Sequence, residues 1–155
     1  MTEPDPIVGQ PLDRTVIEEL LPRGMPLSLV DCDLEEVDLS GLDLTGWHLE
    51  RCRLRKAVLK GTRLEGTRWQ GCRGGFADFT GADLSEAVLR SCDFNNANFL
   101  GARLGDAVVS GSKLTGANFT DAGLLGTKFE ETLLVGAHLR GVSFRKLPLR
   151  ALDLS

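Results

Sequence analysis

The 155-residue sequence has few of the features that identify an enzyme or a membrane protein. It contains only two histidines, His48 and His138, no HExxH pattern and no glycine-rich phosphate loop that opens a helix. No run of about eighteen apolar residues occurs, which argues against a membrane-spanning helix. The first residues also lack the basic and apolar segments of a secretory signal. The sequence therefore predicts a cytoplasmic protein that is not an enzyme and has no small-molecule substrate.

An excess of charge of one sign is also missing, because the net charge is only −4. The charges are nevertheless banded along the chain. Residues 31–50 carry seven acidic residues and no Lys or Arg, whereas residues 51–70 carry seven basic residues and one Glu. Two such bands in neighbouring segments favour mutual ion pairing at the surface, where each exposed pair contributes about 0–1 kcal/mol. Direct nucleic-acid binding is therefore not expected.

What the sequence does have is a large apolar residue at every fifth position. This series runs from Leu34 to Leu154 and is interrupted once, at Gly74. The positions two residues earlier hold small residues from Cys52 to Ala137, and glycine fills half of the positions two residues later. A period of five fits neither a helix nor an ordinary strand and indicates a solenoid of stacked units.

The spacing of the cysteines predicts the size of one coil. Cys32, Cys52, Cys72 and Cys92 all occupy the small inward position, twenty residues apart. Four units per coil would stack them in one column and give an all-β, quadrilateral parallel β-helix of about six coils. Such a column is too long for one zinc ion, so we expect small buried thiols and no metal or cofactor. The inward residues that represent the expected core are Leu34, Leu54, Leu84, Phe94, Leu104, Phe119 and Leu139.

The two ends of the repeat region require closure. Residues 1–30 are expected to form a loose tail (residues 1–10) and a short capping helix, for which Thr15 and Glu18 fit a capping box. The β-helix itself is assigned to residues 31–155. Bulky residues take over the small inward register at both ends, and they are Val37, Leu42, Trp47, Val142, Leu147 and Leu152. With Pro148 in the last coil, this pattern leaves two alternatives open, a self-closed monomer and a tail-to-tail homodimer.

The interruption at Gly74 predicts a local gap in the core. We expect the gap to be filled by Phe76 or Trp69, and the alternative is that Phe76 forms an exposed aromatic contact point. The outward residues Val88 and Val108, twenty positions apart, are expected to stack beside Trp69. Together, Trp69, Phe76, Val88 and Val108 form a candidate protein-docking strip.

The repeats resemble those of a known family. The units Gly-Ala-Asp-Leu-Ser (81–85), Gly-Ala-Asn-Phe-Thr (116–120) and Gly-Leu-Asp-Leu-Thr (41–45) are similar to the A(D/N)LXX repeats of the pentapeptide repeat family. The resemblance implies a right-handed quadrilateral β-helix in a bacterial protein that acts as a non-catalytic protein-interaction or scaffold module. Its protein partner is unknown.

The same resemblance offers an alternative function. Qnr-type quinolone-resistance proteins and their relatives are rods that mimic DNA and bind DNA gyrase or topoisomerase, so gyrase is a candidate partner. This sequence differs from that group, because it has no continuous acidic face, no loop insertions and no C-terminal dimerising helix. Membership of the fold alone does not establish this function.

Overall fold

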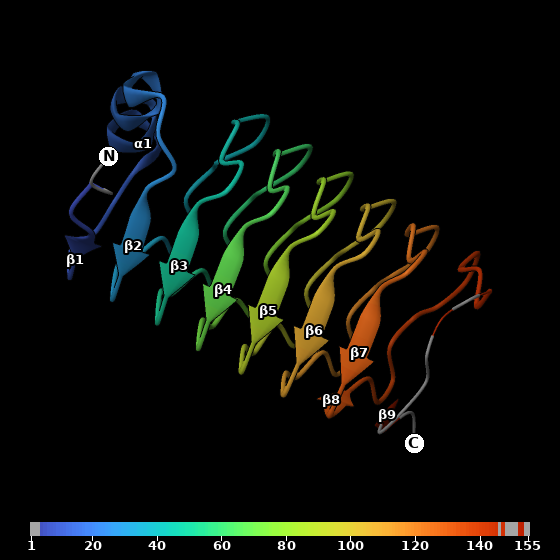
Figure 1. Cartoon of the computed structure of the whole chain (residues 1–155). Coiled ribbons are helices and arrows are strands. Elements are labelled where there is room, and N and C mark those ends of the chain that lie inside the picture. The colour runs from blue at the N-terminus through green and yellow to red at the C-terminus, as the bar shows by residue number, and fades with distance from the viewer. Residues whose placement is uncertain (1–3, 146, 148–151, 154–155) are drawn as a thin grey trace.

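The computed structural model describes residues 4–145, 147, 152 and 153, and there the chain winds into a parallel β-solenoid with one short α-helix (Figure 1). Along one side of the solenoid, three-residue strands recur every twenty residues. They are β2 (Ser28–Val30), β3 (His48–Glu50), β4 (Arg68–Gln70), β5 (Val88–Arg90), β6 (Val108–Ser110) and β7 (Lys128–Glu130). A strand near the N-terminus, β1 (Ile7–Val8), extends this sheet, whose strand order is β1 to β7. The six repeated strands therefore mark about six coils.

From β2 to β6, each strand residue pairs with the residue twenty positions later, so side chains form columns along the solenoid. Leu29 pairs with Leu49, for example, and Leu49 pairs with Trp69. The other three sides consist mainly of isolated parallel bridges, and from Asp33 on these bridges have the same spacing of twenty residues. We call the side with β2–β7 face 1, and the sides through Arg53, Val58 and Arg63 faces 2, 3 and 4.

The corners between the faces depend on the backbone conformation of one residue per side. From Asp31 to Gly141, every fifth residue has a positive φ, between 48° and 76°. Glycine adopts this left-handed conformation without a steric penalty, which explains why it fills half of the positions two residues after the large apolar residues. The corner N–H groups donate to carbonyls of the next coil, as Gly61 does to Thr80 (2.9 Å). One left-handed residue per side thus produces the five-residue period.

The inside of the solenoid is filled by the two inward registers. The following predicted core residues are at most 1 % exposed: Leu34, Leu54, Leu84, Phe94, Leu104 and Phe119. Leu139, in the last coils, is only partly buried. Buried hydroxyl groups donate to backbone carbonyls, as Thr62 does to Leu39 (2.9 Å). Within the described part of the chain, no buried side-chain nitrogen or oxygen lacks a hydrogen-bond partner.

The N-terminal segment differs from the expected loose tail, because residues 7–11 already pair with the first coil. Ile7 and Val8 lie beside Leu29 and Val30, and Pro11 lies beside Asp33. The sequence did not predict this strand, because the segment is rich in Pro and Gly and a two-residue strand is too short to show a period.

The capping helix is present, but its first residues differ from the prediction. Helix α1 (Arg14–Leu20) is followed by the 3-10 turn η1 (Leu21–Arg23). Its N-cap is Asp13, whose carboxylate accepts the N–H of Val16 (2.9 Å), so the capping box proposed for Thr15 is wrong. The buried side chains of Ile17 and Leu20 cover the first coil.

The gap at Gly74 is filled by neither of the side chains that we expected. Phe94, which lies twenty positions later in the same column, occupies the space, because a Cβ on Gly74 would overlap its ring. Phe76 instead points into solvent with 54 % of its surface exposed. The stacking neighbour along the solenoid therefore compensates for the missing side chain.

The C-terminal end continues the solenoid as far as the structure describes it. Strand β8 (Thr132–Leu133) pairs with β9 (Leu152–Asp153) in a separate two-stranded sheet. Val142 and Leu147 pack against the core, whereas Phe144 is 48 % exposed. Pro148 and the side chain of Leu152, on which the prediction of closure rested, lie outside the described residues.

Candidate functional site

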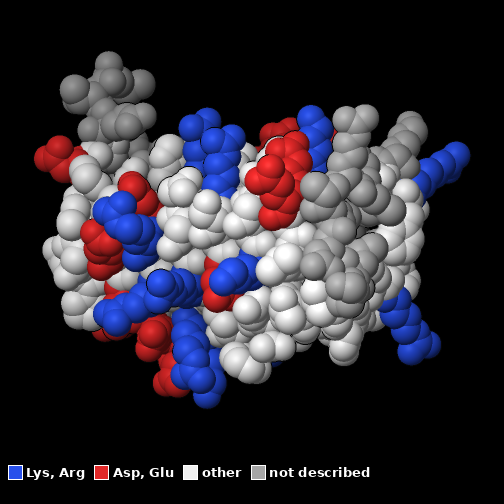
Figure 2. Space-filling view, turned by 90° about the horizontal axis from the view of Figure 1, so that it is seen from below, with Lys and Arg blue, Asp and Glu red and all other residues white. Residues whose placement is uncertain are grey.

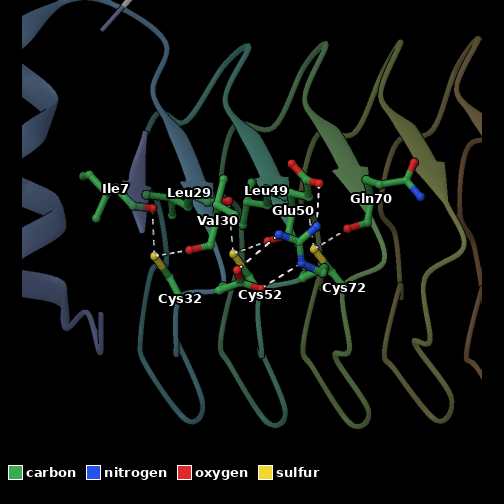
Figure 3. A network of polar contacts seen from close by, with 11 residues as sticks. Ile7, Leu29, Val30, Cys32, Leu49, Glu50, Cys52, Gln70 and Cys72 are labelled. Carbon is green, nitrogen blue, oxygen red and sulfur yellow. Dashed lines mark hydrogen bonds and ion pairs between the residues drawn. The ribbon is translucent and has the colours of Figure 1, made fainter. Parts of the chain in front are cut away.

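The cysteines form one column inside the solenoid, as Figure 3 shows for Cys32, Cys52 and Cys72. Each thiol in the middle of the column donates to a carbonyl twenty-three residues earlier. Cys52 donates to Leu29 (3.3 Å) and Cys72 donates to Leu49 (3.2 Å). All four cysteines are buried and none forms a disulfide. The thiols therefore act as small hydrogen-bonding core residues.

The ionisation of these thiols also argues against a nucleophilic role. The neighbouring Cys72 thiol, together with burial, raises the pKa of Cys52 far above the usual thiol value. Cys52 lowers the pKa of Cys72, but contact with Cys92 and burial outweigh this effect and raise it to about 12. The neighbouring Cys72 thiol lowers the pKa of Cys92. The Cys92 thiol is nevertheless buried inside the solenoid, where it donates to the carbonyl of Arg90 (3.3 Å). Reactive thiolates need both a low pKa and access to solvent, and no thiol of the column has both.

The metal-binding potential of the described residues is low, and the two histidines lie on different faces. No group of three His, Cys, Asp or Glu side chains there is arranged to hold a metal ion. His48 lies on face 1 in β3, and His138 lies on face 3 beside Asn118. Among the same residues, no helix has the length and apolar character needed to cross a bilayer.

The predicted docking strip is only partly a surface feature. Trp69 was wrongly included, because it is 1 % exposed and its ring N–H donates to the buried hydroxyl of Thr67 (2.9 Å). Its position in the five-residue apolar series already indicated an inward side chain. Val88 and Val108 do lie side by side on face 1, where both are partly exposed. Phe76 lies elsewhere, at the corner that follows face 2.

Face 1 carries a shallow groove beside the two valines. Its volume is about 370 Å³, and its floor is the backbone of β3 and β4. The two columns of outward side chains that border it are His48, Arg68 and Val88 on one side and Glu50, Gln70 and Arg90 on the other. The backbone groups of the floor are used in the strand ladder, so a ligand would contact side chains.

A second hollow, which the sequence analysis did not identify, lies on face 2 at Gly75 and Phe76. It has a volume of about 320 Å³, and Arg53, Arg55 and Arg73 line it. A sequence signal for it exists, because Gly75 is an outward position and glycine there removes a side chain from the column.

The charged bands pair across the ladder as the sequence suggested. Arg51 donates to Asp31 (2.9 Å) and Arg53 lies 3.5 Å from Asp33, each twenty positions apart. Figure 2 shows basic and acidic side chains directly beside one another on the face that it presents. The side chains of the pairs Arg51–Asp31 and Arg53–Asp33 are more than one-third exposed, so each pair contributes little to stability. On that face the opposite charges largely cancel.

The sequence and the structure are similar to those of known proteins. The sequence profile described as Pentapeptide repeats matches residues 32–68, 75–111 and 102–141, in eight copies. No curated protein sequence matches the chain closely enough to count as a relative.

Several solved structures are similar. A pentapeptide repeat protein from the thylakoid lumen of Arabidopsis thaliana, AT2G44920, has 36 % sequence identity and a TM-score of 0.50, over 57 % of this chain and 69 % of that one. HetL, involved in heterocyst differentiation regulation in Nostoc sp. strain PCC 7120, has 17 % identity and a TM-score of 0.42, over 96 % and 86 %. The plasmid-mediated fluoroquinolone resistance protein QnrB1 has 22 % identity and a TM-score of 0.41, over 96 % and 91 %.

Proposed function

Because this chain belongs to the pentapeptide repeat family, we propose that it is a non-catalytic docking module that binds a protein partner on face 1. The observation that carries the proposal is the pair Val88 and Val108 on the continuous sheet of β2–β7. Arg68, Arg90 and Lys128 adjoin this pair on the same face. An apolar centre with a polar and charged rim is the usual composition of a protein–protein contact surface.

The rigidity of the sheet supports this function. On face 1, each strand from β2 to β6 pairs with a parallel strand on both sides. The inward side chains of these strands are buried. A partner would therefore meet outward side chains that need little ordering on binding, which reduces the entropic cost of association. The described residues offer no arrangement of nucleophile and base that would favour an enzyme.

Affinity capture after in-cell crosslinking tests the proposal. The bait is the wild-type protein, and the test variant carries Val88→Asp and Val108→Asp, which place two charges at the centre of the surface. We expect a protein that is retained by the wild type and lost from the test variant. Val58→Asp is the matched control, because Val58 is a partly exposed valine on face 3.

The control and the double variant must fold equally well, which circular dichroism can establish. Retention of no protein above background, or equal loss with Val58→Asp, would contradict docking on face 1.

The charge distribution does not favour a DNA mimic. Such a protein needs a continuous acidic surface, whereas Asp31 and Asp33 are paired with Arg51 and Arg53. We therefore expect that this protein, added at a concentration of about 1 μM, leaves the supercoiling activity of DNA gyrase unchanged. Inhibition at that concentration would favour the DNA-mimic function over the proposed one.

A further inference from the structure

Two adjacent residues on face 2 are not explained by folding. Gly75 does not have a positive φ, and a Cβ built on it would make only an ordinary contact with the Asn95 carbonyl (3.7 Å), so a side chain would fit. Phe76 has a φ of 59° and is 54 % exposed, although bulky residues rarely adopt this conformation. Among the residues that the structure describes, every other non-glycine residue with a positive φ is polar or charged. Such a departure from the residue types that the backbone favours is a reason to look for a function.

Together these two residues shape the hollow on face 2, which we call the Gly75 notch. The missing side chain at Gly75 opens the outward column between Arg55 and Asn95, which lie twenty positions before and after it. Phe76 stands at the edge of the opening, and Arg73 lies in the neighbouring column. The notch therefore combines an apolar ring with guanidinium groups.

Some polar groups of the notch already have partners within the protein, and others do not. The Asp93 carboxylate accepts the N–H of Asn95 (3.1 Å), and the Asn95 side-chain oxygen accepts the N–H of Thr115 (2.9 Å). By contrast, no carboxylate lies within 4.0 Å of Arg55 or Arg73 among the described residues. The groups left without partners are thus cationic donors and one aromatic face.

From these contacts we infer that the Gly75 notch binds a protein segment in which an acidic side chain lies next to an apolar one. The carboxylate pairs with Arg55 and Arg73, and the apolar side chain enters the space above Gly75 and packs on Phe76. Charge-assisted, bidentate pairing is the geometry in which arginine recognises carboxylates most strongly. This site is separate from Val88 and Val108 on face 1, so it can fail while the proposed function holds.

A nucleic acid fits the notch less well. Glu35 and Asp93 line the same hollow, so the notch offers no run of cations that could pair with successive phosphates. The basic groups also do not continue along the column, where Thr115 and Val135 follow Asn95. A nucleic-acid groove needs a continuous basic path, whereas one acidic side chain needs only the two arginines.

Selection from a phage-displayed library of random peptides tests this inference. The library is first depleted on the Gly75→Leu variant, in which a side chain fills the notch, and is then selected on the wild-type protein. We expect the enriched peptides to carry Asp or Glu beside an apolar residue. As synthetic peptides, they should bind Gly75→Leu and Phe76→Gly at least about tenfold more weakly than the wild type.

A matched variant separates the notch from the rest of face 2. Thr115→Leu adds a similar side chain to the same outward column two coils away, and it should leave binding within about twofold of the wild type. Arg55→Gln combined with Arg73→Gln should weaken binding and reduce its dependence on salt. Phe76→Gly should keep or raise the thermal midpoint, since glycine favours a positive φ, so that lost binding cannot be attributed to unfolding.

Three results would overturn the inference. They are the absence of peptides that prefer the wild type to Gly75→Leu, enrichment of peptides without acidic residues, and equal loss of binding with Thr115→Leu. A labelled single-stranded oligothymidine that binds the wild type and is lost with Gly75→Leu would assign the notch to nucleic acid instead.

Discussion

At the scale of the residue, inward and outward positions of this solenoid carry different constraints. A residue at the small inward position must either be apolar or donate a hydrogen bond to the backbone. Cysteine and threonine both donate such a bond, in the same way. Cys52 donates to Leu29 and Thr62 donates to Leu39, each twenty-three residues earlier. The large inward position must exclude water, whereas outward positions tolerate most side chains.

One pair of neighbouring residues tests this division. Leu104 is 1 % exposed, whereas the side chain of Arg103 is 69 % exposed and lies 3.5 Å from Asp83. We expect Leu104→Asp to cost more than about 4 kcal/mol and to unfold the protein, because it buries an unpaired charge. Arg103→Gln should change the free energy of unfolding by less than about 1 kcal/mol. Urea unfolding followed by circular dichroism measures both, and similar tolerance would show that the assigned registers are wrong.

The contact between Gly74 and the Phe94 ring that fills its space gives a second prediction at this scale. Gly74→Ala should destabilise the protein by about 1–3 kcal/mol, because its methyl group would overlap the Phe94 ring. In the Phe94→Leu background, the same substitution should cost clearly less, since the smaller side chain leaves room. A double-mutant cycle from urea unfolding measures this coupling, and additive effects would contradict the contact.

The limits of sequence-based prediction are also clearest for single residues. The five-residue series placed Trp69 inward, yet the predicted docking strip included it because Val88 and Val108 were expected to stack beside it. Similarly, the partner of Gly74 was sought among neighbours in sequence, whereas the twenty-residue spacing points to Phe94. In a solenoid, the residues that pack together are adjacent along the axis rather than along the chain.

At the scale of the element, the N-terminal segment protects the first coil. Strand β1 pairs with the open edge of β2, and helix α1 covers the inward side chains with Ile17 and Leu20. The sequence predicted a capping helix in this segment. It missed Asp13 as the cap and β1 as a strand, because a two-residue strand carries no periodic signal and its pairing partner lies twenty-two residues away.

Loss of this protection should change the state of association. Ile17→Asp places a charge in the contact between α1 and the first coil, where Ile17 is 1 % exposed. We expect the helix to detach and the exposed edge of the sheet to pair with other molecules, which gives oligomers or aggregates. The adjacent Val16→Asp is the control, because Val16 is 36 % exposed. Light scattering after size-exclusion chromatography measures the mass, and equal masses for both variants would contradict this role.

At the scale of the whole molecule, the turn carboxylates make stability depend on pH. Hydrogen bonds from the hydroxyl and N–H of Thr45 lower the pKa of Asp43, and the hydrogen bond from Arg51 lowers that of Asp31. A carboxylate with a lowered pKa in the folded state contributes its full stability above the pKa of the unfolded chain, about 4. That contribution is lost as the pH falls further, through the lowered pKa of the folded state.

Asp43→Asn isolates this effect. Asparagine can accept the same turn hydrogen bond, as Asn118 does from Thr120 (2.9 Å), but it does not ionise. Between pH 7 and 5, the wild type and the variant should show a constant difference in thermal midpoint. Below about pH 4, the wild type should lose stability faster than the variant. Parallel curves down to pH 2 would contradict a lowered pKa for Asp43.

The architecture was predictable from the sequence at this scale, because one repeated pattern specifies every coil. The cysteine spacing gave the twenty-residue circuit, and the parallel pairing of Leu29 with Leu49 and Leu49 with Trp69 has the same period. The docking surfaces were less predictable. The Gly75 notch depends on which side chains meet across three coils, and the regular pattern does not encode that.

The repeated coil also determines which changes of length the molecule could accommodate. Removal of residues 101–120 would join Leu100 to Asp121, which has nearly the same φ as Gly101 (57° and 63°). The rod would then be one layer shorter, and every surface column would stay aligned. Removal of only five residues between Val88 and Val108 would rotate all later layers by a quarter revolution and place the two valines on adjoining sides. Twenty residues are therefore the step by which such a rod can grow or shrink while it preserves its binding faces.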